Sequence, residues 1–165
     1  MDLIRTAVPD DAVAINDIYN HYVLHSTCTY QEEPEPLDVR QRWLAEHSGG
    51  HVVRVVVEAD GTVVGWASLS RHHPRSAYRY TVEDSIYLRH DRLGRGLGTR
   101  LLADLIDQAR RGGFRSIIAG ASAEQQASIA LHRRAGFVPV AHLKEVGFKF
   151  DRWLDVVYLQ LALEV

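Results

Sequence analysis

The stretch from residue 92 to residue 110, RLGRGLGTRLLADLIDQAR, constrains the fold more than any other part of this chain. Gly94, Gly96 and Gly98 stand directly before a segment whose apolar residues recur at helical spacing. Glycine gives the turn its backbone freedom, and the first N–H groups of a helix have no intrahelical partner. The stretch therefore predicts a helix N-terminus that binds a phosphate or pyrophosphate. We expect the buried face of this helix to consist of Leu97, Leu101, Leu102, Leu105, Ile106 and Ala109.

Two familiar phosphate motifs do not fit this stretch. A P-loop ends in Gly-Lys-Ser/Thr, whereas this turn ends in Gly98, Thr99 and Arg100. The dinucleotide-binding fingerprint requires a glycine three residues after its second glycine, and the two possible positions hold Thr99 and Leu101. A tight strand-to-helix turn without a ligand stays open as the alternative.

Composition limits the classes of protein that this chain can belong to. Its 165 residues, 46% of them hydrophobic, are expected to form one domain over residues 1–165, and a net charge of −2 does not favour a nucleic-acid partner. Cys28 is the only cysteine, so an intramolecular disulfide and cysteine-based zinc modules are excluded. We read the histidine pairs at positions 21 and 25 and at 72 and 73 as surface histidines, because each lacks companion metal ligands. No apolar run resembles a secretory leader or a membrane span, so we expect a cytoplasmic protein without a metal.

The hydrophobic pattern predicts eleven helices and strands in the order β-α-α-β-β-β-α-β-α-β-β. This order fits an α/β (α+β) fold with one mixed sheet and helices on both of its faces. The strands are expected at 3–7, on both sides of the turn 59–61, and at 78–88, 115–122, 138–146 and 154–163. The helices are expected from Pro9 to about Leu24, at 37–47, from 97 to the glycines at 112–113, and from 124 to Gly136.

The pattern D-S-I-Y-L-x5-G-x-G-x-G-T at 84–99 resembles the acetyl-CoA site of the GNAT N-acetyltransferase superfamily. The segment ASIALHRRAGF, which ends at Phe137, is similar to the second conserved helix of that superfamily. Residues 18–34, 78–90, 128–137 and 146–161 resemble the phosphinothricin and methionine sulfoximine acetyltransferases, so the resemblance covers nearly the whole chain. It implies the GNAT acyl-CoA N-acyltransferase fold, with a mostly antiparallel central sheet flanked by about four helices. It also implies acetyl-CoA as co-substrate, no metal, and a homodimer.

The resemblance assigns a cofactor site to the strand, the glycine turn and the later helix. The turn amides would hold the pyrophosphate, and the strand would pair with pantetheine and polarise the thioester carbonyl. Leu93 stands where the superfamily has Gln or Arg, so Arg92 or Arg95 is expected to supply the charge; Gln125 replaces the usual Asn. The implied cofactor residues are Ile86, Tyr87, Leu88, Gly94, Arg95, Gly96, Leu97, Gly98, Thr99, Gln125 and Ser128.

Acetyl transfer to an amine needs a base at neutral pH, and the resemblance supplies two candidate catalytic residues. Glu83, within TVEDS, matches the catalytic glutamate and would act directly or through a water. His132 matches a histidine of the second conserved helix, where it would deprotonate the amine or protonate the leaving thiolate. Without the resemblance, each is an ordinary polar side chain of a strand or helix.

The resemblance also implies a site for an amino-acid-like substrate. A guanidinium at Arg75 would bind a carboxylate through two parallel hydrogen bonds, and Arg79 is a rival for the same task. Tyr30 matches an aromatic residue of the first substrate loop. The implied substrate-binding residues are Tyr30, His73, Pro74, Arg75, Glu83, Asp84 and Ser85.

The sequence thus predicts a cytoplasmic acetyl-CoA-dependent N-acetyltransferase. The expected acceptor is the α-amino group of a small molecule such as phosphinothricin, methionine sulfoximine or methionine sulfone. Because Cys28 has no Cys-His arrangement beside it in the sequence, direct attack by the amine is favoured over an acetyl-enzyme. Two alternatives stay open: the same chemistry on a protein N-terminus or an antibiotic, and a non-catalytic acetyl-CoA-binding regulatory module. Leu93 and Gln125 motivate the latter.

Overall fold

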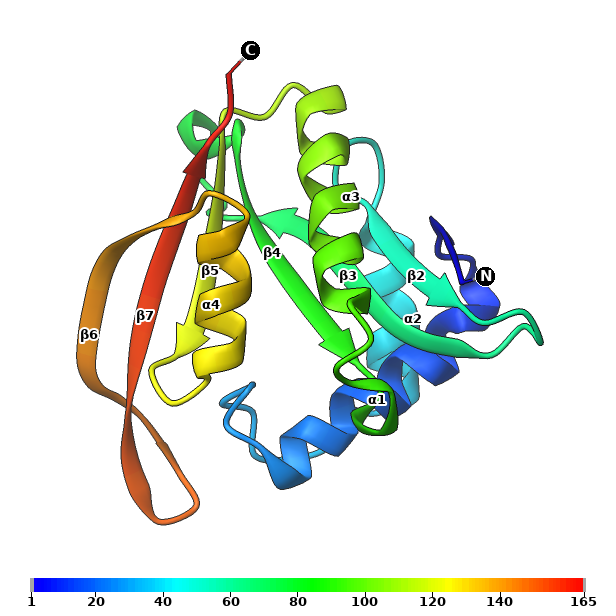
Figure 1. Ribbon diagram of the computed structural model, residues 1–165, viewed down its shortest axis with the longest axis horizontal. Coiled ribbons are helices and arrows are strands. Elements are labelled where there is room, and N and C mark those ends of the chain that lie inside the picture. The colour runs from blue at the N-terminus through cyan, green and yellow to red at the C-terminus, as the bar shows by residue number, and fades with distance from the viewer. Residues whose placement is uncertain (1, 165) are drawn as a thin grey trace.

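A computed structural model describes residues 2–164, which form a seven-stranded sheet in the order β1-β2-β3-β4-β5-β7-β6 (Figure 1). All neighbouring strands are antiparallel except β4 and β5, so the predicted mixed, mostly antiparallel sheet is confirmed. The strands are β1 Leu3–Thr6, β2 Val53–Val57, β3 Val63–Arg71, β4 Thr81–Leu88, β5 Ser116–Ser122, β6 Val138–Lys149 and β7 Arg152–Ala162. The helices are α1 Ala12–His25, α2 Leu37–Glu46, α3 Leu97–Arg111 and α4 Gln126–Arg134, in the predicted order.

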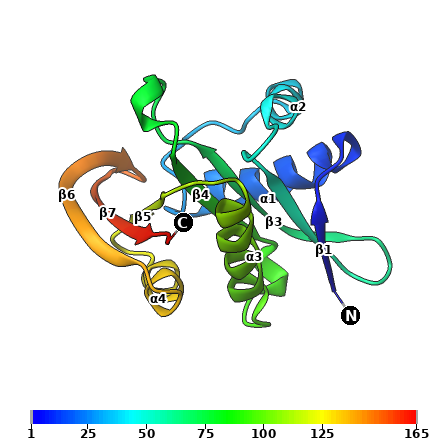
Figure 2. The ribbon, with the colours of Figure 1, turned by 90° about the horizontal axis from the view of Figure 1, so that it is seen from above.

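The helices lie in two layers on opposite faces of the sheet. Seen from above, α1 and α2 cover one face, and α3 and α4 cover the other (Figure 2). Each layer has its own apolar cluster, one around α3 and one between α1 and Trp66 of β3. The six apolar residues expected to form the buried face of α3 are all buried, so that prediction is confirmed.

Three predicted strands had boundaries that differ by two or more residues from those of the structure. The strand expected from Tyr78 begins at Thr81, because residues 76–78 form a 3-10 turn in which Tyr78 N donates to Arg75 O at 3.1 Å. The last two strands are longer than expected and meet at a two-residue turn. Phe150 and Asp151 both have left-handed backbone conformations in this turn, as a type I′ hairpin requires.

Strand β4 positions the candidate site because it pairs with β3 along nearly its whole length but with β5 only at its start. It pairs with β3 from Val82 to Leu88, but its ladder with β5 covers only Thr81–Glu83 opposite Ser116–Ile118. Both strands continue beyond that ladder and diverge, which opens a V in the sheet toward its lower end in Figure 1. Successive β4 side chains alternate between the α3 layer and the α1 layer.

Candidate active site

The V between β4 and β5 contains a cavity of about 110 Å³. Its walls come from the last part of β4, the end of β5 and one side of α4 with its N-cap, and one residue comes from the loop after α1. Because the two strands are unpaired with each other here, their edge groups are free to bond a chain threaded between them. The lining residues are Cys28, Asp84, Ser85, Ile86, Tyr87, Gly120, Ala121, Ser122, Gln125, Ser128 and His132.

The glycine turn has the geometry of an anion site. Gly94 and Gly96 both have φ of 76°, and Gly96 is the N-cap of α3. A Cβ atom at either position would have no other atom within 4 Å. Glycine is therefore required here by the positive φ of the backbone and not by lack of space. The backbone hydrogen bond that closes the first turn of α3 runs from Arg100 N to Gly96 O at 3.2 Å. The preceding amides at the helix start are therefore free to bind an anion.

The arginines of the turn are already paired with a carboxylate. Arg92 Nε and Arg95 Nη1 lie 3.0 and 2.7 Å from the same oxygen, Glu58 Oε1. The hydrogen bonds from Arg95 and Arg92 lower the pKa of Glu58. We therefore expect backbone N–H groups to be the chief ligands of an anion at the turn. The positive charge that the sequence predicted from Arg92 or Arg95 is partly neutralised by Glu58.

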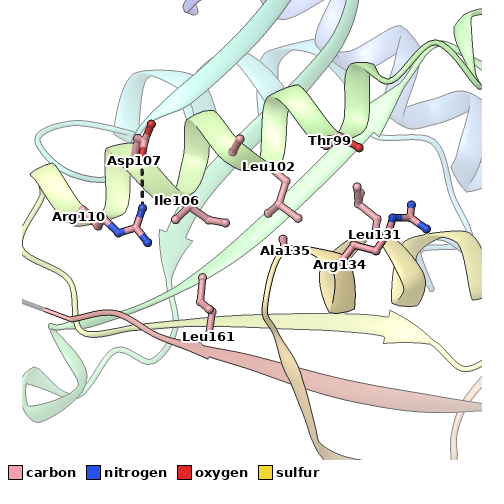
Figure 3. Close-up of a pocket in the computed structure, with 10 residues that line it drawn as sticks. Thr99, Leu102, Ile106, Asp107, Arg110, Leu131, Arg134, Ala135 and Leu161 are labelled. Carbon is pink, nitrogen blue, oxygen red and sulfur yellow. Dashed lines mark hydrogen bonds and ion pairs between the residues drawn. The ribbon is translucent and has the colours of Figure 1, made fainter.

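A second cavity, of about 420 Å³, runs between α3 and α4 from the same turn (Figure 3). Thr99 lies at its end nearest the turn, and the pair formed by Arg110 and Asp107 lies at the other end, with Nη1 and Oδ1 3.3 Å apart. Leu102, Ile106, Leu131 and Leu161 line it between these ends. The turn therefore opens into a groove with an apolar floor and the ion pair of Arg110 and Asp107 at its far end.

Glu83 projects from β4 on the face opposite Asp84 and bonds a neighbouring histidine. Its Oε1 lies 2.8 Å from His72 Nδ1, and its side chain is 44% exposed, so water and a small molecule can reach it. Glu83 is paired with Ser70 across the ladder with β3, one residue from the point where β4 leaves β5. His72 therefore does more than the surface histidine expected from the sequence, because it fixes this carboxylate.

His132 is buried on α4 and pairs with Asp84 of β4. His132 Nδ1 donates to Ser128 O at 2.8 Å, and Nε2 lies 2.7 Å from Asp84 Oδ2. Burial alone would lower the pKa of His132, but the hydrogen bond and the charge of Asp84 outweigh it and raise the pKa. Both neighbours are acceptors, which favours the protonated form of the ring.

The free end of β4 is anchored by tyrosines. The Tyr22 hydroxyl, on α1, donates to Leu88 O at 2.5 Å, and burial raises the pKa of Tyr22 to about 12. Tyr87 stacks on Trp66 with ring centroids 5.0 Å apart. These contacts hold residues 86–88 in place although β5 gives them no ladder.

The predicted substrate residues are divided between two loops. His73, Pro74 and Arg75 lie between β3 and β4, where Arg75 is exposed and its backbone N donates to His73 Nδ1 at 3.2 Å. The guanidinium of Arg79 lies 4.6 Å from the centroid of the Tyr80 ring, so it is engaged by an aromatic face. Of the two rival arginines, Arg75 makes no side-chain hydrogen bond or ion pair within residues 2–164.

Tyr30 packs between the loop after α1 and the last hairpin. Its hydroxyl donates to Asp155 O at 2.5 Å. Its ring lies on Gly147, where a Cβ would be 2.6 Å from Tyr30 Cδ2. Only glycine at 147 lets the ring approach so closely, and the contact fixes the loop 26–30 against β6 and β7.

The geometry joins an anion-binding turn, a V between two strands and a reachable carboxylate. Residues 15–137 match the acetyltransferase (GNAT) family. The chain belongs to this family. Within residues 2–164, no group of three or more His, Cys, Asp or Glu side chains is arranged to hold a metal, and no helix is long and apolar enough to span a membrane.

Relatives within the GNAT family match almost the full length of the chain. It is 41% identical to the L-methionine sulfoximine/L-methionine sulfone acetyltransferase of Salmonella typhimurium, over 98% of this chain and 94% of that protein. It is 40% identical to the phosphinothricin N-acetyltransferase of Alcaligenes faecalis, over 97% of this chain and 82% of that protein. An acetyltransferase structure from S. typhimurium solved with its cofactor acetyl-CoA has a TM-score of 0.94 and 41% identity, over 99% of this chain and 94% of that one.

Many of the residues that the sequence predicted for this GNAT site do lie together. The cavity in the V brings seven of them to one place, which are Asp84, Ser85, Ile86, Tyr87, Gln125, Ser128 and His132. Gln125 contacts the loop after α1 directly, since its Nε2 donates to Thr27 Oγ1 at 2.9 Å. His73, Pro74, Arg75 and Tyr30 are not among the lining residues.

Sequence reasoning missed His72 and Lys149 in this GNAT acetyltransferase. Lys149, a buried residue of β6, donates from Nζ to Ser26 O at 2.7 Å and to Thr29 O at 2.8 Å. Burial lowers the pKa of Lys149. Neither residue carries a signal in the linear sequence, because each acts through a partner from a distant part of the chain.

Proposed function

We propose that this acetyl-CoA-dependent N-acetyltransferase acts on the α-amino group of a small amino-acid-like compound, of the methionine sulfone, methionine sulfoximine or phosphinothricin type. One observation carries the proposal. Glu83 is the last residue of β4 in the ladder with β5, so it stands beside the point where the V begins. The substrates named for the two curated relatives support the acceptor class.

The residues present fit acetyl-CoA. The free amides of the turn at Gly96 suit a pyrophosphate, and the V gives an extended arm two unpaired strand edges. When bound, acetyl-CoA supplies an acetyl group activated as a thioester. Beyond Glu83, β4 is paired with β3 only, and alternate N–H groups point away from β3. Those of Ile86 and Leu88 therefore face the V, where they are available to pair with the arm and to polarise the thioester carbonyl.

Glu83 takes a proton from the substrate ammonium, directly or through one water. A free α-amine is scarce at neutral pH, so a positioned carboxylate raises the fraction that can attack. His72 holds Oε1 of Glu83 and leaves Oε2 for this task. The side chain of Glu83 is exposed enough for a substrate to reach and fixed enough to keep one orientation.

His132 serves the departing thiolate. With both ring nitrogens facing acceptors, the imidazolium has no free nitrogen to accept a proton from the amine. It lines the cavity in the V, where its positive charge favours a thiolate; donation of the Nε2 proton to that thiolate would replace the hydrogen bond to Asp84. Of the two roles implied by the resemblance, this is the one that the contacts of His132 support.

Arg75 binds the carboxylate of the substrate. It is exposed at the loop before β4, and Arg79 is already engaged by Tyr80. A planar guanidinium binds a carboxylate through two parallel hydrogen bonds, which would orient the α-amino group toward Glu83.

The amine attacks the thioester directly. Cys28 lines the V, but no histidine among residues 2–164 is hydrogen-bonded to its thiol, so it lacks an activating base. A Cys28→Ser variant that keeps full turnover supports this route. Loss of turnover together with a ping-pong rate pattern would overturn it.

The test is coenzyme A release from acetyl-CoA by the purified protein with a panel of amines. The panel contains L-methionine sulfone, L-methionine sulfoximine, phosphinothricin, an unmodified N-terminal peptide and an aminoglycoside. Rapid release with any of the first three supports the proposal. Release with only the peptide or the aminoglycoside overturns the substrate class, and tight acetyl-CoA binding without turnover favours a regulatory module.

We also propose that the protein is a homodimer that works in the cytoplasm, where acetyl-CoA is available. Strand β6 is a sheet edge, and together with β7 and the turn between them it exposes several large apolar side chains. Such a surface is costly in water, and a second copy of the chain would cover it. The exposed residues are Val138, Val140, Leu143, Val146, Phe148, Phe150 and Trp153.

A further inference from the structure

The loop after α1, residues 26–30, bridges the two sides of the V. On the β4 side, the hydroxyl of Tyr87 donates to Cys28 O at 3.4 Å. On the β5 side, where β7 and β6 follow in the sheet, Lys149 of β6 donates to Ser26 O at 2.7 Å. Figure 1 shows the loop beside the start of α4. The loop therefore lies across the open end of the V, whose cavity it helps to line.

Thr27 is the buried member of this loop, and its hydroxyl has two partners at the junction of β5 and α4. Gln125 Nε2 donates to Thr27 Oγ1 at 2.9 Å, and Thr27 Oγ1 donates to Glu124 Oε2 at 3.1 Å. Glu124 also forms an ion pair with Arg152 at the start of β7. We call the contact of Thr27 with Gln125 and Glu124 the latch. It uses both the donor and the acceptor capacity of the hydroxyl, so it gives the loop one defined position against α4.

The latch gives Gln125 a different partner from the one that the resemblance implied. The resemblance placed Gln125 on the cofactor, in place of the usual Asn, whereas the amide nitrogen of Gln125 is engaged by Thr27. An Asn side chain is shorter by one methylene group, so its nitrogen would be withdrawn by about 1.5 Å. The hydrogen bond to Thr27 is lost at that separation. The longer side chain of Gln125 is therefore what joins the wall of the V to the loop.

We propose that Gln125 is a positioning residue for the amine substrate, because the latch fixes the loop 26–30 against the wall of the cofactor site. The inference rests on the proposed function, since Tyr30 in this loop is a residue expected to bind the substrate. Gln125 lines the cavity in the V, and it acts on the amine through Thr27 and the loop. Loss of the latch lets the loop open more often, which weakens binding of the amine and leaves the chemistry at Glu83 intact.

The first test is Gln125→Asn, with the amine and the cofactor measured separately. We expect the KM for L-methionine sulfone to rise about threefold or more, the effect of one lost hydrogen bond. The kcat and the calorimetric Kd of acetyl-CoA should stay within about twofold of the wild-type values. Gln126→Asn is the matched control and should change none of these quantities, because Gln126 is exposed and its Nε2 donates to Ala123 O at 2.8 Å. A raised Kd for acetyl-CoA with an unchanged KM for the amine would place Gln125 on the cofactor and overturn the inference.

Two substitutions at Thr27 separate the hydrogen bonds of the latch from the packing of the loop. Thr27→Val keeps the shape of the side chain and removes its hydroxyl, so it should reproduce the higher KM of Gln125→Asn. Thr27→Ser keeps the hydroxyl and should have a KM close to that of the wild type. A Thr27→Ser protein as impaired as Thr27→Val would assign the effect to packing and contradict the latch.

Amide hydrogen exchange tests the latch without turnover. Exchange at residues 26–30 should be about fivefold faster or more in Gln125→Asn and in Thr27→Val than in the wild type, whereas exchange in α3 should not change. If the protein acetylates no amine, the proposed function fails, and exchange still tests the latch. If one of the two variants fails to fold, the other is sufficient. Unchanged exchange at residues 26–30 in a folded variant would overturn the role of Gln125.

Discussion

Nε2 of His132 and Oδ2 of Asp84 lie 2.7 Å apart, between the helix after the V and the strand that forms one of its sides. Ser128 O accepts from the other ring nitrogen at 2.8 Å. In this arrangement a protonated His132 is paired with the carboxylate of Asp84, and both residues line the cavity in the V. The pair also ties α4 to β4 at residue 84, directly after the last residue of β4 that pairs with β5.

The pair makes stability depend on pH. The pKa of His132 is raised in the folded state above its ordinary value of 6.5, so its stabilisation is complete below about pH 6.5. It is lost as the pH rises through the raised pKa. His132→Gln should therefore lower the free energy of unfolding by about 1.5–3 kcal/mol at pH 6 and by less at pH 9. Urea unfolding at both pH values checks this, with His25→Gln, at an exposed position, as control; an equal cost at both would contradict it.

Alanine substitutions at two glycines of the turn should differ in their effect on stability. Gly96 has φ of 76°, which costs a residue with a Cβ about 1–2 kcal/mol. Gly98 has no such conformation, and a methyl group there would meet Leu131 Cδ2 at 3.5 Å, an ordinary contact. Chemical unfolding without acetyl-CoA should thus show Gly96→Ala destabilised and Gly98→Ala close to wild type. Equal stabilities would show that the turn is not held by conformation.

Lys149 should matter for the loop that carries Tyr30. Lys149→Met keeps the length of the side chain but leaves buried carbonyl groups at Ser26 and Thr29 without their donor. We expect a loss of about 1–3 kcal/mol in the free energy of unfolding and a higher KM for the amine. Lys144→Met, at an exposed position of the same strand, is the control and should change neither. An unchanged KM would contradict a role of this loop in binding the substrate.

The apolar surface on β6 and β7 should be an interface. Trp153 is 62% exposed in the single chain, so Trp153→Glu adds a charge where a second copy would pack. Light scattering should report a dimer for the wild type and a monomer for the variant. A wild-type monomer at micromolar concentration would contradict the assembly.

Much of the fold could be predicted from local patterns in the sequence. The face of α3 that buries Leu97, Leu101 and Leu105 was predicted completely, because helical periodicity is a property of one continuous segment. The β-strand expected from Tyr78 began late, because the 3-10 turn at 76–78 depends on a backbone bond that apolar alternation does not encode.

The candidate site was predictable only as a set of residue types. The resemblance named Glu83 and His132, but their partners His72 and Asp84 have side-chain contacts that only folding creates. The pairing of Arg92 with Glu58 likewise joins residues 34 positions apart. The divergence of β4 from β5 follows from register, which a single sequence does not specify.

The most direct test of the account compares Glu83→Gln with the wild type. Two quantities are needed, kcat for L-methionine sulfone and the Kd of acetyl-CoA measured by calorimetry. The account predicts that kcat falls about 10²–10⁴-fold while the Kd stays the same, because Glu83 acts on the amine and lies outside the V. Glu46→Gln, at an exposed position on α2, should change neither quantity. A Glu83→Gln protein with unchanged kcat would contradict the role of Glu83 as the base.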